Sequence, residues 1–70
     1  MIRETLTSSA LRSVGWEFDT LEVEFKDGQV WQYQDVPESA YKEMMNGSTT
    51  PGKYFYKNIR SRFKGTRSNG

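Results

Sequence analysis

The chain has 70 residues, 34% of them hydrophobic, with no cysteine, no histidine and a formal net charge of +1. This length predicts one domain over residues 1–70, and the missing residue types exclude disulfides, Ser-His-Asp and Cys-His catalysis, and the nitrogen and sulfur ligands that zinc sites normally require. No apolar run approaches a membrane span and no signal-peptide pattern opens the chain, so we expect a soluble, cytoplasmic, non-enzymatic domain with no cofactor, no metal and no membrane contact.

The first half of the chain predicts three strands. Residues 1–8 show no clear period and are expected to be frayed. Residues 9–18 predict a strand whose alternation breaks between Leu11 and Val14, beside Gly15, as at a bulge or a close backbone approach. Residues 21–25 and 29–34 alternate cleanly between apolar and polar side chains and predict two more strands.

The segment Lys-Asp-Gly at residues 26–28 is the strongest hairpin signal, and its loop length decides which side chains share a face. A two-residue loop would place Trp31 and Tyr33 on the face of the strand glutamates. A three-residue loop with the glycine left-handed would instead pair Val23 with Trp31 and Leu21 with Tyr33. We prefer the second register because it buries far more apolar area, which makes both rings core residues that a ligand would touch only at their edges.

Two helices are predicted after the strands. The first begins at Asp35–Glu38, with Asp35 as the cap and Pro37 in the first turn, and ends at Gly47. Its core-facing row is Val36, Ala40 and Met44. The second has Thr50 as the cap and Pro51 in its first turn. Its buried stripe is Phe55, Ile59 and Phe63.

The predicted fold is therefore an α+β domain, a three-stranded antiparallel β-meander followed by two helices packed on one face. Its ordered core is expected to span about residues 8–64. Residues 65–70 are expected to be disordered, as chain termini often are.

An ordered series of residues supports a family resemblance. The series is Ser8-Ser9, Val14-Gly15-Trp16, Leu21-x-Val23-x-Phe25, Gly28-x-Val30-Trp31-x-Tyr33, Val36-Pro37, Tyr41, Ser48, Gly52-Lys53-Tyr54-Phe55 and Ile59-Arg60. It resembles the KTSC domain, which occurs at the C-terminus of some lysyl-tRNA synthetases and alone as a short bacterial protein. The resemblance implies no known activity, and the synthetase context suggests RNA as a partner. Two positions depart from the family pattern: Trp31 replaces the first tyrosine of a Tyr-x-Tyr, and residues 48–52 lengthen a short Ser-x-Gly.

The net charge hides an asymmetry. Residues 1–43 carry nine acidic and four basic side chains, a net charge of −5, whereas residues 44–70, the basic segment, carry six basic and no acidic side chains, a net charge of +6. Such a segment attracts polyanions, and complementation of a helix dipole would explain only its last turn. We therefore predict RNA, single-stranded or tRNA-like, as the partner. The predicted phosphate contacts are Lys53, Lys57, Arg60, Arg62 and Lys64, and the predicted aromatic contacts are Tyr56, Trp31 and Tyr33.

Other interpretations of these residues stay open. A protein partner could add a strand to an exposed sheet edge or meet the acidic sheet face, without any nucleic acid. The basic helix could instead dock on the acidic half of the same chain or of a second copy. Glu22 and Glu24 could form an acid–base pair, and residues 48–52 could hold a phosphate, but exposed strand glutamates and ordinary helix caps are far commoner.

Overall fold

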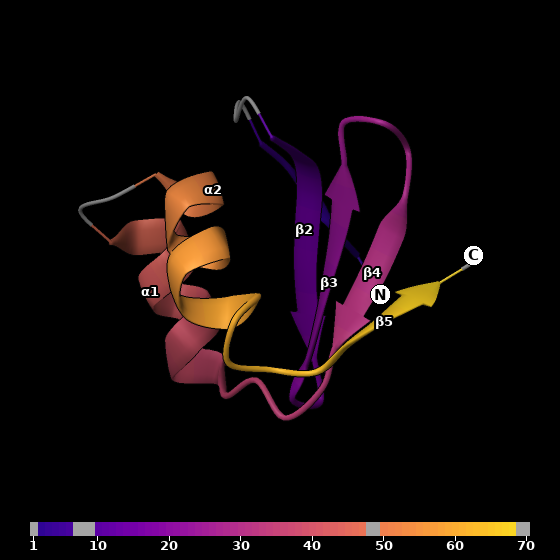
Figure 1. The fold of residues 1–70 in the computed structure, drawn as a ribbon. Helices are drawn as coiled ribbons and strands as arrows, with labels where there is room; N and C mark the ends of the chain where they lie inside the picture. Colours follow the sequence, from indigo (N-terminus) through magenta and orange to yellow (C-terminus); the bar gives the residue numbers. More distant parts are fainter. Residues whose placement is uncertain (1, 7–9, 48–49, 69–70) are drawn as a thin grey trace.

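A computed structural model describes residues 2–6, 10–47 and 50–68, and it arranges them in two layers, with helices over one face of an antiparallel sheet (Figure 1). The sheet has five strands in chain order: β1 (Glu4–Thr5), β2 (Leu11–Glu17), β3 (Thr20–Phe25), β4 (Val30–Tyr33) and β5 (Gly65–Ser68). The helical layer lies between β4 and β5 in the chain: α1 (Glu38–Asn46), α2 (Pro51–Tyr54) and a π-helical turn, η1 (Phe55–Ile59).

The predicted three-stranded meander is wrong, because β1 and β5 extend it at both edges. Both added strands are short and carry mostly exposed side chains, so neither shows the apolar alternation that reveals a half-buried strand. Backbone pairing holds them instead: Glu4 pairs with Val14, and Gly65 pairs with Tyr33. Residues 65–68, which the sequence left outside the ordered core, are thus part of the sheet.

The central hairpin has the register that we preferred. Leu21 pairs with Tyr33 and Val23 with Trp31. The loop closes through a 3.0 Å hydrogen bond from the Gly28 N–H to the Phe25 carbonyl, and Gly28 is left-handed with φ of 93°. Glycine adopts that conformation without steric cost, so the turn sets which side chains face the helices.

Strand β2 is irregular where the sequence predicted. Its pairing with β3 shifts between Leu11 and Ser13, within the predicted break. Gly15 makes the close backbone approach: a Cβ there would lie 2.5 Å from the carbonyl oxygen of Ile2. A side chain at residue 15 would therefore push the N-terminal segment away from the sheet.

The core lies between the sheet and the helices. Its fully or almost fully buried apolar side chains are Leu11, Val14, Leu21, Val23, Tyr33, Val36, Met44, Phe55 and Ile59. The predicted buried rows of the two helices are confirmed at four positions: Val36, Met44, Phe55 and Ile59 are all 0% exposed. Burial of such side chains is the main stabilising contribution in a domain this small.

One predicted helix cap is wrong and another is confirmed. Helix α1 begins at Glu38 with Pro37 as its N-cap residue, and Asp35 makes no cap because it lies two residues before Pro37, in the left-handed region at φ of 60°. The buried Val36 fixes this entry: its N–H donates to Asp19 O at 2.9 Å, and its carbonyl accepts from Trp16 Nε1 at 2.7 Å. At α2, the Thr50 hydroxyl caps the helix as predicted.

Gly47 is the C-cap of α1, as predicted, and its N–H donates to the Glu43 carbonyl at 2.8 Å. Within the described ranges, no helix has the length and apolar character needed to cross a lipid bilayer.

Candidate functional site

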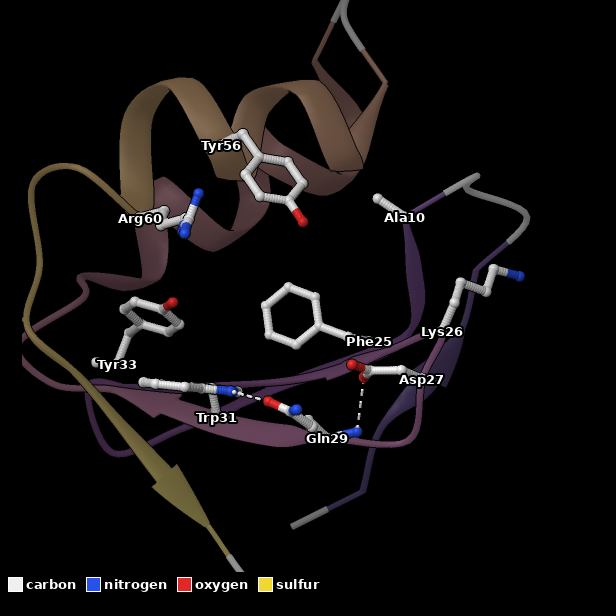
Figure 2. A pocket seen from close by; sticks show the side chains of 10 residues that line it. Ala10, Phe25, Lys26, Asp27, Gln29, Trp31, Tyr33, Tyr56 and Arg60 are labelled. Atoms are coloured by element: carbon white, nitrogen blue, oxygen red, sulfur yellow. Dashed lines mark hydrogen bonds between the residues drawn. The ribbon is translucent and has the colours of Figure 1, made fainter.

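A groove of about 630 Å³ opens between the hairpin end of the sheet and the helical layer (Figure 2). Phe25 at the end of β3 and Trp31 and Tyr33 on β4 form its sheet side. Tyr56 and Arg60, on and just after η1, form its helix side. The groove therefore combines residues from three separate parts of the chain, and most of its large side chains are aromatic.

Phe55 packs beneath the groove, in contact with three of its aromatic rings. It is fully buried, and its ring centroid lies 5.2 Å from Tyr33, 5.3 Å from Tyr56 and 5.8 Å from Phe25, each in an edge-to-face arrangement. Such pairs are favoured by the charge distribution of aromatic rings. One core residue thus contacts three rings of the groove, so the shape of the groove depends on how the core is packed.

The π-helical turn sets the helix side of the groove. The Arg60 N–H donates to the Phe55 carbonyl at 2.8 Å, a bond that spans five residues in place of the usual four. Turns of this kind occur often at functional sites. The Arg60 guanidinium carbon lies 5.4 Å from the centroid of the Tyr56 ring, within the range of a cation–π interaction. Arg60 and Tyr56 therefore form one positively charged, aromatic wall.

The hydroxyl groups of Tyr33 and Tyr56 and the Arg60 guanidinium face the same space (Figure 2). Burial raises the pKa of Tyr33 above its ordinary value, an effect that the positive charge of Arg60 offsets only in part. The Tyr33 hydroxyl therefore stays protonated at neutral pH and can donate a hydrogen bond to a ligand.

A chain of hydrogen bonds positions Trp31 at the rim. Asp27 Oδ1 accepts from the Gln29 N–H at 3.0 Å, and Gln29 Oε1 accepts from Trp31 Nε1 at 3.2 Å (Figure 2). The indole is thus fixed by its own strand and turn while its ring stays partly exposed.

The structure brings half of the predicted contact residues together in the groove: Trp31, Tyr33, Tyr56 and Arg60. The others are exposed but do not line it: Lys53, Lys57, Arg62 and Lys64. Tyr33 is only 5% exposed, so its core assignment is confirmed, whereas Tyr56 is 41% exposed. Contact of these residues with RNA stays a prediction.

Sequence reasoning missed six residues of the groove: Ala10, Phe25, Lys26, Asp27, Gln29 and Gly65. Phe25 was treated only as a core residue, although the three-residue hairpin loop places it on the face of Trp31. Gln29 could have been predicted, because it lies two residues before Trp31 and therefore on the same face of the strand. Gly65 had no local signal, because it lines the groove only through the pairing of β5 with β4.

The opposite face of the sheet, the outer face, carries Glu22 and Glu24. Both carboxylates form hydrogen bonds or ion pairs with side chains of neighbouring segments. Arg3 Nη1 lies 2.6 Å from Glu22 Oε2, Gln32 Nε2 donates to Glu22 Oε1 at 2.8 Å, and Ser13 Oγ donates to Glu24 Oε1 at 3.0 Å. Burial by itself would raise the pKa of Glu22, but the hydrogen bonds from Gln32 and Arg3 outweigh it and lower the pKa below its ordinary value. Glu22 is therefore charged at neutral pH, and both carboxylates have partners within the chain.

The cations of the basic segment, in contrast, have no ion-pair partners among the described residues. Within residues 2–6, 10–47 and 50–68, the ion pairs join Arg3 and Arg12 to strand glutamates, and no carboxylate pairs with a lysine or arginine of the basic segment. The basic helix therefore does not dock on the acidic residues of its own chain in this part of the molecule. Among the same residues, no three acidic side chains gather closely enough to hold a metal ion.

Comparison with known proteins identifies the family. The sequence model of the KTSC domain matches residues 7–63. The crystal structure of a KTSC domain protein from Yersinia pestis is similar to this chain, with 30% sequence identity, a TM-score of 0.84 and coverage of 96% of both chains. No curated protein matches the chain. Since the match covers most of the sequence and the similar structure covers nearly all of it, this chain belongs to the KTSC domain family.

Proposed function

We propose that this domain is a non-enzymatic module that binds single-stranded RNA, with a base in the aromatic groove and neighbouring phosphates on the cations around it. The observation that carries the proposal is the meeting of Trp31, Tyr56 and Arg60, three residue types suited to this ligand, at one groove.

The groove suits a base in size and chemistry. Its volume of about 630 Å³ falls within the range of roughly 300–1,000 Å³ that is usual for small-ligand sites. Tyr56 and Trp31 offer partly exposed rings, and stacking of a base on such a ring contributes about 1–3 kcal/mol without sequence preference. The Tyr33 hydroxyl can donate to a base carbonyl.

The surrounding charge suits phosphates. Arg60 lies at the groove, and Lys57 is exposed on the same π-helical turn that carries Tyr56. Because neither has an acidic partner among the described residues, neither must break an ion pair to bind an anion. Phosphate contacts of this kind supply affinity but no sequence preference.

The non-enzymatic part of the proposal rests on the carboxylates. Glu22 and Glu24 are occupied by arginine, glutamine and serine side chains on the outer face, away from the groove. Asp27, the one acidic residue among those that line the groove, lies in an exposed turn and accepts a backbone hydrogen bond. A general base must lie within hydrogen-bond reach of the substrate, and among the described residues only the exposed Asp27 has a carboxylate at the groove.

A protein partner at the acidic face has less support. The carboxylates that would meet a basic partner are paired within the chain, so a partner would have to displace Arg3 from Glu22 at a cost in free energy.

Fluorescence anisotropy of a short labelled oligouridine and of a length-matched duplex, at several salt concentrations, tests the proposal. We expect the single strand to bind more tightly, with a log–log salt slope of about −0.7 for each phosphate contact. Arg60→Gln should weaken binding more than Lys42→Gln, which removes the same charge outside the groove. Absence of binding at low salt would refute the proposal, and a preference for the duplex would argue against a base in the groove.

A further inference from the structure

Strand β5 lies next to the groove although it follows the segment that the KTSC model matches, residues 7–63. Gly65, its first residue, lines the groove and pairs with Tyr33. The Tyr33 ring rests against the Gly65 backbone so closely that a Cβ at residue 65 would lie 2.5 Å from Tyr33 Cε2 and 2.7 Å from Cζ. The position of the Tyr33 ring, and with it one side of the groove, therefore depends on β5.

The same strand places a cation beside the partly exposed indole of Trp31. Arg67 is the direct pairing partner of Trp31 in the β4–β5 ladder. Directly paired residues of antiparallel strands project from the same face, with Cβ atoms about 4.5–5.5 Å apart. Trp31 lines the groove, so the exposed Arg67 side chain projects from the groove side of the sheet. No carboxylate of the described residues pairs with it.

Arginine at this place serves two interactions of a nucleotide. Its planar guanidinium stacks on aromatic faces and binds phosphate oxygens through two parallel hydrogen bonds. A base stacked on Trp31 would carry its own backbone phosphate, within reach of a side chain that projects from the neighbouring strand. Arg60 and Arg67 thus lie on two different elements that border the groove, one on the helix side and one on the sheet edge.

We infer that β5 completes the ligand site and that Arg67 contacts the RNA backbone next to the base held at Trp31. This inference rests on the proposed function and extends it by a residue outside the matched segment. It also makes the site two-sided: a single strand of RNA would pass between Arg60 and Arg67 across the aromatic groove.

The test compares Arg67→Gln with Lys42→Gln, two variants that lose the same charge from exposed positions of the full chain. The probe is labelled oligouridine, read by anisotropy over a range of salt concentrations. For Arg67→Gln we expect Kd to rise about tenfold and the salt slope to become shallower by about 0.7, the value of one phosphate contact. For Lys42→Gln the rise should stay below about threefold, since this variant loses only general charge attraction.

The outcomes separate the inference from the proposed function. Binding by the wild-type chain with equal effects of both variants would overturn the role of β5 and leave the groove proposal standing. Absence of wild-type binding at low salt would overturn both. Circular dichroism and thermal unfolding of each variant test whether the fold is retained. In a Trp16→Phe background, where Trp31 is the one remaining tryptophan, quenching of its fluorescence by RNA that is reduced by Arg67→Gln would place the contact at Trp31.

Discussion

On the outer face of the sheet, Glu22 and Glu24 are held by Arg3 and by side chains of neighbouring strands. On the groove face, Arg60 lies over a tyrosine ring and Arg67 is paired with a tryptophan across the β4–β5 ladder, and neither forms an ion pair with a carboxylate of the described residues. Both faces are strongly charged. The difference is that the charges of the outer face are paired within the chain, whereas those of the groove face are available to a ligand.

This difference indicates where a partner gains free energy. Displacing a paired, partly buried arginine leaves a carboxylate without its partner, which is costly. Binding a polyanion to unpaired cations releases counterions and is favourable at low salt. A sequence count of charge treats both faces alike, so the pairing of the charges, not their number, distinguishes the two faces.

The largest expected effect is on stability, from the residue that supports the groove. Phe55→Ala should lower the free energy of unfolding by about 3–5 kcal/mol, because it removes a fully buried ring and leaves a cavity. Gln32→Ala on the outer face should cost only about 1.5–3 kcal/mol, the net value of one hydrogen bond to a charged group. Urea denaturation of both variants measures the two losses, and equal losses would contradict the view that the core of the domain lies on the groove side.

Loss of the exposed groove ring should reduce RNA binding more than stability. Tyr56→Leu keeps an apolar contact with Phe55 but removes the stacking surface, so we expect a loss of about 1–3 kcal/mol in binding free energy. Anisotropy titration measures the affinity. Unchanged affinity in a folded variant would mean that no base enters the groove.

A side chain on Gly65 should disturb the groove from the sheet edge. Gly65→Ala would place its Cβ against the Tyr33 ring. Such overpacking typically lowers the free energy of unfolding by about 1–3 kcal/mol. Thermal unfolding and RNA titration should both show the loss. Thr66→Ala, on the opposite face of the same strand, is the matched control and should leave both values nearly unchanged.

The ion pairs of the outer face should make the stability of the domain depend on pH. The pKa of Glu22 is lowered in the folded chain below its ordinary value of 4.5, so the folded state gains stability from the charged form above that pH. This gain should disappear as the pH falls through the lowered pKa. Arg3→Gln should shrink the pH dependence without changing RNA affinity. Urea midpoints from neutral to acidic pH measure the first effect, and a loss of RNA binding in this variant would contradict the separation of the two faces.

The smallest effect concerns the turn between β2 and β3. Phe18 and Asp19 both have positive φ, 49° and 61°, and Phe18 is 88% exposed. Asparagine and glycine are the preferred residues of such a two-residue turn. The double change Phe18→Asn and Asp19→Gly should therefore raise the free energy of unfolding by about 1 kcal/mol and leave RNA binding unaltered. Destabilisation would show that Phe18 makes a contact that its exposure does not suggest.

Much of the central fold was predictable because its signals are local. The three-residue turn at residues 26–28 fixed the hairpin register, and the apolar rows of the helices identified Val36, Met44, Phe55 and Ile59 as buried. The series of residues typical of the KTSC domain also depends on sequence order alone. In each case neighbouring residues carry the information, since apolar side chains repeat with the period of the element that buries them.

The edge strands and the groove depended on tertiary structure. Residues 4–5 and 65–68 pair through backbone groups and keep their side chains mostly exposed, so no apolar period marks them. Asp35 looked like a helix cap, but the buried Val36 and its bonds to Trp16 and Asp19 fixed the chain differently. The sequence by itself therefore determined the hairpin, the core and the family. The tertiary structure decided which charges are paired and which rings share a groove, because those contacts join residues that are distant along the chain.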